Sequence, residues 1–472
     1  MDNMENLYNG EPRRPNPRRR KRDPVKEFIR TYVPLILVVL VIILFIIFVV
    51  GSIKRSNERR EEARLASIAS QQAAAQQQLD WEVEAARLVE EANILAAGYD
   101  YDAAIRQIES FSGNLYDFDE LVSAKESYER TRDSLIAWSD PGRIVNLSFN
   151  LLVADPQRAY ANSKYGSSFA RNFITVSEFT NILTQLHENG YVLVDLDDFI
   201  QVTTDESGKT TYAPKTIYLP GGKKPLVLTQ THVNYNTYMI DSDGDGLADK
   251  GGSGFASRLV LDANGALTCE YVDKNGNVLT GAYDMVPILN TFIQSHPDFS
   301  YQGARAILAV SGYDGLFGYR TDPETAEKIS QEYYDQQLQQ VPAILDALRR
   351  DGYTIACYTY DNLAYGSLTP DELQEDLDNW TNEVTPILGE TPILVYAKES
   401  DIGRYQGEKY DRIINAGFRY FLGFCEDVDP WIEFTDSYVR QGRILVNGSN
   451  LGAKPYLFIG MFDAKSVLDP AR

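Results

Sequence analysis

Apolar and polar residues follow three successive patterns along the chain. Residues 33–50, "VPLILVVLVIILFIIFVV", carry no charge and are about long enough to cross a bilayer as a helix. Residues 54–138 contain no proline and are rich in Ala, Glu, Gln and Arg, which is a helix-forming composition. Beyond the turn signal "SDPGR" at 139–143, apolar strands alternate with amphipathic helices. Strand-then-helix repetition predicts a parallel sheet or barrel of the α/β class.

The apolar run is predicted to remain in the protein as a membrane anchor, because it lacks the small-residue cleavage pattern of a signal peptide. The denser basic cluster, "RRPNPRRRKR" at 13–22, precedes the run, whereas Glu partly balances the basic residues after it. We therefore expect a single-pass protein of the cell membrane, with a cytoplasmic N-terminus and an extracellular C-terminal domain. Four segments are expected: a basic tail (1–30), a transmembrane helix (31–52), a helical stalk (53–140) and an α/β domain (141–472).

Within the stalk, residues 85–111 have the spacing of two closely packed helices. Alanines alternate there with Leu and Ile, and Gly98 separates two helical stretches. Small residues at such positions let two helices approach closely, which is typical of a tetratricopeptide-type pair. Residues 115–138 are expected to form a third helix. Two interpretations stay open: a spacer that packs on itself, or a scaffold surface that recruits a partner protein.

The α/β region gives a definite element order. Strands are expected at 143–154, 225–228, 304–310, 354–360 and 392–398, helices at 175–191, 325–353 and 371–388, and a helix followed by a strand at 410–424. The helix at 175–191 opens with Thr175 and Glu178 in capping-box spacing and closes at Asn189-Gly190. The run 192–200 is taken to continue it.

Composition narrows the classes of partner. The formal net charge of −22 excludes partners that need a basic surface, such as nucleic acid. Cys269, Cys357 and Cys425 are widely spaced in apolar or aromatic surroundings, without a CxxC pair or a disulfide framework. They are predicted to be small buried side chains.

Six stretches then carry a resemblance: "SEFTNILTQLHENGYVLVDLDDF", "KPLVLTQTHVNY", "LNTFIQSHPDFSYQGARAILAVSGYDGLFGYRT", "LRRDGYTIACYTYDN", "TPILVYAKES" and "YDRIINAGFRYFLGF". In this order, the region from about residue 143 to residue 468 resembles the polysaccharide deacetylase family, the NodB-homology carbohydrate esterases. The resemblance implies a distorted (β/α) barrel with its site at the carboxyl ends of the strands. The whole chain is then a barrel of this type preceded by a transmembrane helix and a tetratricopeptide-like helical stalk.

The resemblance also implies a chemistry. Active members of the family hold a divalent metal with one Asp and two His, and a second Asp is the base. The metal polarises an acetamide carbonyl and activates a water molecule. One carboxylate and two neutral imidazoles leave an open coordination position, and the base takes the proton of the water.

The matching positions of this chain depart from that set. The Thr-Phe-Asp-Asp motif corresponds to residues 229–232, which places Thr231 at the base position and His232 at the position of the metal carboxylate. A threonine hydroxyl does not accept a proton near neutral pH. The His-x-x-x-His motif corresponds to Tyr358 through Asn362, so neither of its histidines is present.

The two remaining motifs are also incomplete. The Arg-Pro-Pro-Tyr-Gly type segment corresponds to "LVYAKES", in which only Tyr396 is kept. The late motif lacks its histidine, since the last one in the chain is His296. His187 and His296 both lie at predicted helix ends, where a structural role explains them. His232, Asp361 and Asn362 form at best a poor substitute set for zinc or a similar metal.

Tyrosines near the predicted strand ends suggest that the rim can still bind glycan. The candidates are Tyr235, Tyr358, Tyr360 and Tyr396, with Tyr238 nearby. A tyrosine combines an apolar face with a polar tip, which suits stacking on sugars and hydrogen bonding to them. The alternative is that these rings fill the volume left by lost ligands.

A second candidate site is the loop "DSDGDGLAD". Asp241, Asp243, Asp245 and Asp249, together with the carbonyl of Leu247, have the spacing of a short calcium-binding loop. A solvated acidic turn is the alternative. The Asn-Gly pairs at 264–265 and 275–276 predict two hairpins in a β-insertion that follows this loop.

Three functions remain in competition. The first is a catalytically impaired deacetylase-like protein that binds cell-wall polysaccharide or peptidoglycan. The second is an active metal-dependent N-deacetylase with an altered site, which would need zinc or a similar metal near His232. The third is a membrane scaffold that acts through the helical stalk.

Overall fold

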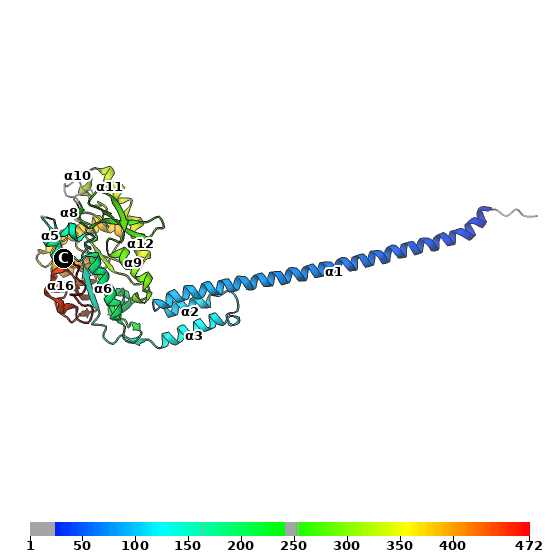
Figure 1. The fold of residues 1–472 in the computed structure, drawn as a ribbon, viewed down its shortest axis with the longest axis horizontal. Coiled ribbons are helices and arrows are strands. Elements are labelled where there is room, and N and C mark those ends of the chain that lie inside the picture. Colours follow the sequence, from blue (N-terminus) through cyan, green and yellow to red (C-terminus); the bar gives the residue numbers. More distant parts are fainter. Residues whose placement is uncertain (1–23, 163, 241–251, 253) are drawn as a thin grey trace, which may run out of the picture. The chain divides into compact units, whose positions relative to one another are not determined.

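The computed structural model describes residues 24–162, 164–240, 252 and 254–472. The chain divides into two compact units, Met1–Val83 and Glu84–Arg472. One helix, α1 (Pro24–Ala97, blue in Figure 1), begins in the first unit and ends in the second. Residue 141, the predicted start of the α/β domain, therefore lies inside the second unit, which also includes the later part of the predicted stalk.

In the first unit, α1 contains the uncharged apolar run. The side chains of this run are exposed, and its length and composition are sufficient to cross a membrane. The helix continues without a break past Gly51 into the Ala-, Glu-, Gln- and Arg-rich residues, so the predicted helix over this part of the stalk is confirmed. The direction in which the helix would cross a membrane stays a prediction.

The second unit opens with a small helical bundle. It comprises the end of α1, α2 (Tyr101–Glu109), the 3-10 turn η1 (Leu115–Asp117) and α3 (Asp119–Asp133). The helix break predicted at Gly98 is confirmed, and the Asp100 carboxylate caps α2 by accepting a hydrogen bond from Ala103 N at 3.0 Å. Buried Leu88 and Ile105 lie in the apolar interior of this bundle.

The third predicted helix ends earlier than expected. It stops at Asp133 rather than at Trp138, because Ile136–Ala137 form a short strand, β1. This strand pairs with β6 (Tyr218–Leu219), and Trp138 N donates to Ile217 O at 2.8 Å. Pairing with a distant segment therefore overrides the local helix propensity.

Seven parallel strands close into a barrel. They are β2 (Val145–Phe149), β7 (Lys224–Thr231), β11 (Ile307–Val310), β12 (Thr354–Cys357), β13 (Ile393–Val395), β14 (Tyr420–Phe424) and β16 (Val439–Leu445). Each of these seven strands pairs with the next of the seven, and β16 pairs with β2 to close the ring. The predicted (β/α) barrel is confirmed by these pairings.

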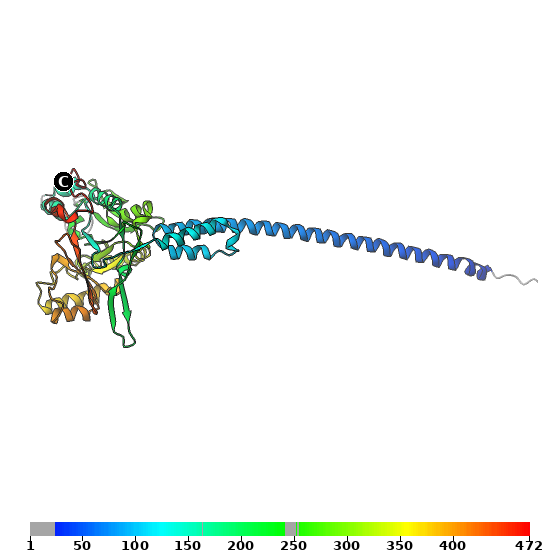
Figure 2. The same cartoon turned by 90° about the horizontal axis from the view of Figure 1, so that it is seen from below.

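One further parallel strand lies beside β7. β3 (Tyr191–Leu193) pairs with the start of β7, whereas β11 pairs with its end. The prediction that 192–200 continues a helix is wrong, because the left-handed backbone of Gly190 (φ 80°) ends that helix. The following segment forms β3, the short helix α7 (Leu196–Phe199) and β4 (Ile200–Thr204). β4 pairs with β5 (Thr210–Pro214) in an exposed hairpin (Figure 2).

The interior of the barrel changes from apolar to polar toward the carboxyl ends of the strands. Val227 and Ile307 belong to the apolar layer. Above them, Thr229 Oγ1 donates to Asn146 Oδ1 at 2.9 Å, and Asn146 Nδ2 donates to Gln441 Oε1 at 3.0 Å. These three side chains are buried, and each supplies a hydrogen-bond partner to another across β2, β7 and β16.

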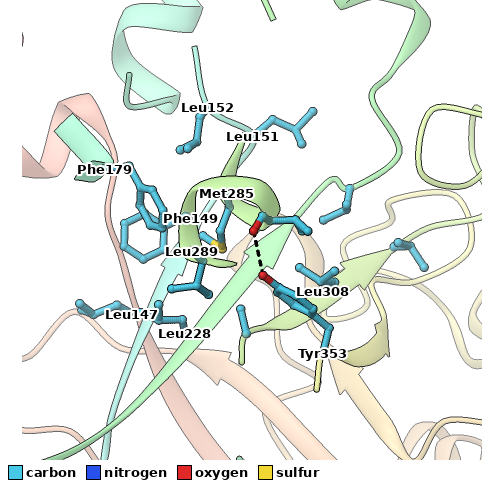
Figure 3. Packing of buried hydrophobic residues seen from close by; sticks show 14 of the residues in the cluster. Leu147, Phe149, Leu151, Leu152, Phe179, Leu228, Met285, Leu289, Leu308 and Tyr353 are labelled. Atoms are coloured by element: carbon cyan, nitrogen blue, oxygen red, sulfur yellow. Dashed lines mark hydrogen bonds between the residues drawn. The ribbon is translucent and has the colours of Figure 1, made fainter. Parts of the chain in front are cut away.

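The outer face of the barrel carries the main hydrophobic core. Leu147 and Leu228 from adjacent strands pack near Phe179 and Leu289 of the covering helices (Figure 3). The hydroxyl of Tyr353 donates to Val286 O at 3.0 Å. Alternation of apolar side chains between the two faces thus builds two cores from the same strands.

Helices and short elements cover the barrel between the strands. The helices are α4 (Pro156–Tyr160), α5 (Gly166–Asn172), α6 (Val176–Glu188), α8 (Thr237–Ile240), α9 (Met285–Ser295), α10 (Glu324–Lys328), α11 (Gln331–Leu338), α12 (Val341–Arg350), α13 (Pro370–Asn379), α14 (Thr385–Leu388), α15 (Glu408–Asn415) and α16 (Gly448–Ala453). The turns are η2 (Pro297–Phe299), the π-turn η3 (Trp380–Val384), η4 (Ala397–Glu399) and η5 (Pro455–Phe458). The remaining strands are β8 (Ala256–Leu261), β9 (Leu267–Val272), β10 (Val278–Gly281) and β15 (Ile432–Phe434).

Several local predictions are confirmed. Thr175 and Glu178 form the capping box of α6. The two Asn-Gly pairs lie in the turns between β8 and β9 and between β9 and β10, which form a three-stranded antiparallel sheet. All three cysteines are buried and free. The predicted helix over 325–353 is instead divided into α10, α11 and α12.

Candidate functional site

A cavity of about 660 Å³ opens at the carboxyl ends of the barrel strands. All seven strands contribute to its lining: Asn150 after β2, Thr231 and His232 at β7, Tyr313 after β11, Tyr358 and Asn362 after β12, Lys398 and Glu399 after β13, Phe424 in β14, and Arg443, Leu445 and Asn447 in or after β16. A wall formed by α5 and its flanks adds Tyr165, Ser168, Phe169, Asn172 and Phe173, and α8 adds Tyr238. Parallel strands that close into a ring bring all their carboxyl ends to one rim, which is why residues distant in sequence meet here.

The end of β7 forms the centre of the cavity floor. Thr231 Oγ1 donates to Asn150 Oδ1 at 2.7 Å, and His232 Nδ1 lies 3.3 Å from the same amide oxygen. His232 Nε2 lies 3.5 Å from Asn362 Nδ2. A neutral imidazole with its proton on Nδ1 fits both contacts. Because the Thr231 hydroxyl is used as a donor to an amide, it is not arranged as a base.

Left-handed backbone conformations cluster around this floor. His232 (φ 61°), Asn362 (φ 51°), Lys398 (φ 50°) and Glu399 (φ 58°) all adopt them in the first few residues after strand ends. Such a conformation at a residue other than glycine costs on the order of 1 kcal/mol or more, so surrounding contacts must maintain it. The strained turns place four polar side chains on the lining instead of continuing the strands.

A guanidinium is buried in the same layer. Arg443 is 4% exposed, and it donates to Ser148 Oγ at 2.7 Å and to Tyr396 O at 3.0 Å. Burial lowers the pKa of Arg443 to about 10. Burial, together with the charges of Arg443 and Lys398, lowers the pKa of His232 to about 4, so its imidazole is neutral at pH 7.

The opposite wall is aromatic. The ring of Tyr238 lies 5.5 Å from that of Tyr165 and stacks on Phe169 at 6.4 Å between centroids. Tyr238 is 38% exposed, and Tyr313 from the β11 side is 47% exposed. The cavity thus combines accessible aromatic faces on one side with hydroxyl, amide and cationic groups on the other.

The structure brings together only some of the residues predicted from sequence. Thr231, His232, Tyr358 and Asn362 all line the cavity, and the rings of His232 and Tyr358 meet edge to face at 4.9 Å. The candidate calcium ligands Asp241, Asp243, Asp245, Leu247 and Asp249 lie outside the described residues.

Three of the four tyrosines proposed for glycan binding do not belong to the lining. Tyr235 is fully buried, and its hydroxyl donates to Asp284 Oδ2 at 2.7 Å. Tyr396 is also buried, and its hydroxyl accepts a hydrogen bond from Tyr405 at 3.0 Å. Tyr360 packs against Gly312 and donates to Glu383. Tyr358 is the member of the set that faces the cavity.

The residues at the family's metal positions do not fit a divalent metal. His232 supplies one imidazole, and the groups around it are the hydroxyl of Thr231 and the amides of Asn150 and Asn362. The nearby charges of Arg443 and Lys398 disfavour a further cation. Across residues 24–162, 164–240, 252 and 254–472, no group of three or more His, Cys, Asp or Glu side chains is arranged to hold a metal ion.

Sequence reasoning missed several lining residues. Arg443, Asn447, Lys398 and Asn150 each lie in or directly after a barrel strand. One available signal was Gln441 and Arg443 at alternate positions of the strand 439–445, which places two polar side chains on one face. The aromatic wall of α5 had no comparable signal, because a helix face is assigned only once its partner is known.

Comparisons with known proteins give fold similarity only. No family model matches the chain, and no curated protein matches it in sequence. Similar solved structures include the Streptococcus pyogenes deacetylase PplD in complex with acetate (11% identity, 66% of this chain, 96% of that chain, TM-score 0.31). They also include a de-N-acetylase from Aggregatibacter actinomycetemcomitans (12% identity, 68% of this chain, 100% of that chain, TM-score 0.37). A polysaccharide deacetylase from Bacillus cereus is similar as well (11% identity, 65% of this chain, 66% of that chain, TM-score 0.32). Because these TM-scores are below 0.5, our description of the barrel rests on its own strand pairings.

Proposed function

We propose that this chain is a membrane-anchored, extracytoplasmic protein of the polysaccharide deacetylase type that binds cell-wall glycan without the metal chemistry of that family. The cavity at the carboxyl ends of the strands carries this proposal. A volume of about 660 Å³ is in the range of small-ligand sites, and the cavity is open enough to admit part of a chain of sugars. The apolar helix at the start of α1 supports the anchored state.

The two sides of the cavity offer different kinds of contact to a glycan. Tyr165 and Tyr238 offer ring faces to the apolar faces of sugars. Opposite them, Asn150, Asn362 and Asn447 offer amide groups to sugar hydroxyls and acetamido groups. The buried Oδ1 of Asn362 has no hydrogen-bond partner among the described residues, so a donor on a bound ligand would satisfy it.

The loss of catalysis is argued from the same positions. The family's base position is Thr231, which donates its proton to Asn150 Oδ1. The family's metal carboxylate position is His232, which lies in a positively charged environment. Neither group performs the step that the family requires of its position. Recruitment of a protein by the helical stalk and calcium binding by the loop at 241–249 stay predictions.

The test uses calorimetry to measure the binding of N-acetylglucosamine oligomers to the full-length chain in nanodiscs. Tyr238→Ala should weaken binding about 3- to 10-fold, the equivalent of about 0.5–1.5 kcal/mol for one lost ring contact. The matched control is Tyr116→Ala, an exposed tyrosine of η1 that is not part of the lining. Equal affinities of wild type and Tyr238→Ala would contradict glycan binding at this wall.

Acetate release is measured on the same samples. We expect none from acetylated oligomers or peptidoglycan, with or without added Zn²⁺. Acetate release that is lost in His232→Ala would overturn the non-catalytic part of the proposal and would favour an active deacetylase with an altered site.

A further inference from the structure

Arg443 is buried without an ion-pair partner among the described residues, and the one carboxylate whose charge acts on it, Glu399, is not in contact with it. The nitrogens of Arg443 donate to four neutral oxygens: Ser148 Oγ at 2.7 Å, Tyr396 O at 3.0 Å, Leu422 O at 3.3 Å and Gly423 O at 3.1 Å. None of the ion pairs formed by the described residues includes it. A buried charge is normally paired, because its transfer out of water costs several kcal/mol.

The hydrogen bonds of Arg443 also leave donors available. Nη1 and Nη2 each carry two hydrogens, and each has one acceptor within the described part of the chain. Two N–H groups of a guanidinium in the cavity lining are therefore free to meet a ligand. A guanidinium presents such groups in the planar fork that matches the two oxygens of a carboxylate or phosphate.

The surroundings of Arg443 add positive charge. Lys398 lies on the rim of the same cavity and forms no ion pair within the described residues. Glu399, the carboxylate of the lining, is exposed and does not pair with Arg443. Asn447 caps α16 with its side-chain oxygen, at 2.8 Å from Asn450 N, which leaves its NH₂ group as another donor. A positive pocket therefore lies in a chain whose formal net charge is −22.

We propose that the cavity selects an acidic glycan, whose carboxylate or phosphate group pairs with Arg443 and Lys398 while the aromatic wall holds the sugar ring. This inference rests on the proposed glycan binding and names the class of glycan. The ligand supplies the counter-ion that the barrel lacks, so the interaction is specific even though the protein as a whole repels anions.

Calorimetry on the full-length chain in nanodiscs of uncharged lipid tests the inference. Three oligomers of equal length are compared: neutral N-acetylglucosamine, one with a carboxylate on alternate sugars, and one with phosphodiester links. We expect one acidic oligomer to bind at least 10-fold more tightly than the neutral one at low salt, and the tighter of the two identifies the anionic group. The preference should shrink as the salt concentration rises.

Amino-acid substitutions test which residues produce the preference for acidic oligomers. Lys398→Gln changes an exposed side chain and should reduce the preference about 3-fold, while Arg443→Gln should abolish it. Lys274→Gln is the matched control, because Lys274 is exposed in the turn between β9 and β10. Thermal unfolding checks that the Arg443→Gln variant folds. If that variant does not fold, the Lys398→Gln variant alone tests the preference for acidic oligomers.

Acetate and inorganic phosphate serve as minimal anions in a parallel experiment. Their binding should shift the imidazole NMR signals of His232, which lines the same cavity, and Lys398→Gln should weaken the shift. Equal binding of neutral and acidic oligomers would overturn this inference and leave glycan binding intact. Binding of the small anions without any glycan would support the anion site and overturn the proposed function. No binding of any probe would overturn both.

Discussion

Replacing Arg472 by methionine tests how the aromatic wall of the cavity is fixed. Arg472 donates to both oxygens of Glu178, through Nε at 2.7 Å and Nη2 at 2.6 Å. It also donates to Ala170 O in α5 and to Phe173 O directly after it. One side chain therefore joins the capping box of α6 to the helix that lines the cavity.

The expected loss of stability follows from the burial of the ion pair between Glu178 and Arg472. The Glu178 side chain is 0% exposed and the Arg472 side chain 15% exposed, so the change leaves a buried carboxylate without its cation. Breaking such a pair costs about 3–5 kcal/mol. Glu178 keeps hydrogen bonds from Thr175 N at 2.8 Å and Asp469 N at 3.1 Å, which places the expected loss at the lower end, about 3 kcal/mol at pH 7.

The measurement is chemical unfolding of the full-length chain at pH 7. Arg171→Met is the matched control, since Arg171 is exposed on α5 and bonds only to Ser167 Oγ among the described side chains, so its loss should stay within about 0.5 kcal/mol. The double variant Glu178→Gln/Arg472→Met should recover part of the stability, because it removes the unpaired charge. A loss below about 1 kcal/mol would refute a buried ion pair at this position.

Two further predictions concern the cavity. The His232 imidazole should titrate near pH 4 in NMR spectra, because burial and the charges of Arg443 and Lys398 disfavour its protonation. The unfolded chain then binds this proton more readily, so His232 should destabilise the fold by up to about 2–3 kcal/mol as the pH falls from about 6.5 to 4; a titration near 6.5 would contradict the positive environment. Gly312→Ala should cost about 1–3 kcal/mol in thermal unfolding, because its new Cβ would lie 2.2 Å from the Tyr360 ring. Gly452→Ala in α16 has no atom within 4 Å and is the control; equal unfolding temperatures would mean that Tyr360 does not pack there.

The barrel was predictable from sequence for a physical reason. Its strands are buried on both faces, so segments such as 225–228 and 304–310 read as short apolar runs between helices. The convergence of Thr231, His232, Tyr358 and Asn362 was predictable too, since parallel strands bring their carboxyl ends to one rim. Local signals likewise located the capping box and the hairpin turns.

The rest of the site depended on information that no single segment carries. Arg443 becomes a lining residue only because β16 closes against β2, a pairing that strand patterns do not specify. Tyr235 and Tyr396 follow strand ends as Tyr358 does, but their rings lie in the core beneath the rim. The direction of a side chain after a strand ends depends on the backbone turn, and several of these turns use left-handed conformations, which residues other than glycine adopt only uncommonly.

The chain order of the strands has a consequence for assembly of the cavity. Neighbouring strands follow one another in sequence until the last step, in which Arg443 on the final strand meets Ser148 on the first, 295 residues apart. Contacts at such a separation form slowly, because the entropy of closing a long loop must be overcome first. Until then the part of the cavity lining that carries Arg443 is missing. A partly folded chain therefore cannot hold a ligand there, and any ligand that binds would favour the completed ring over every open intermediate.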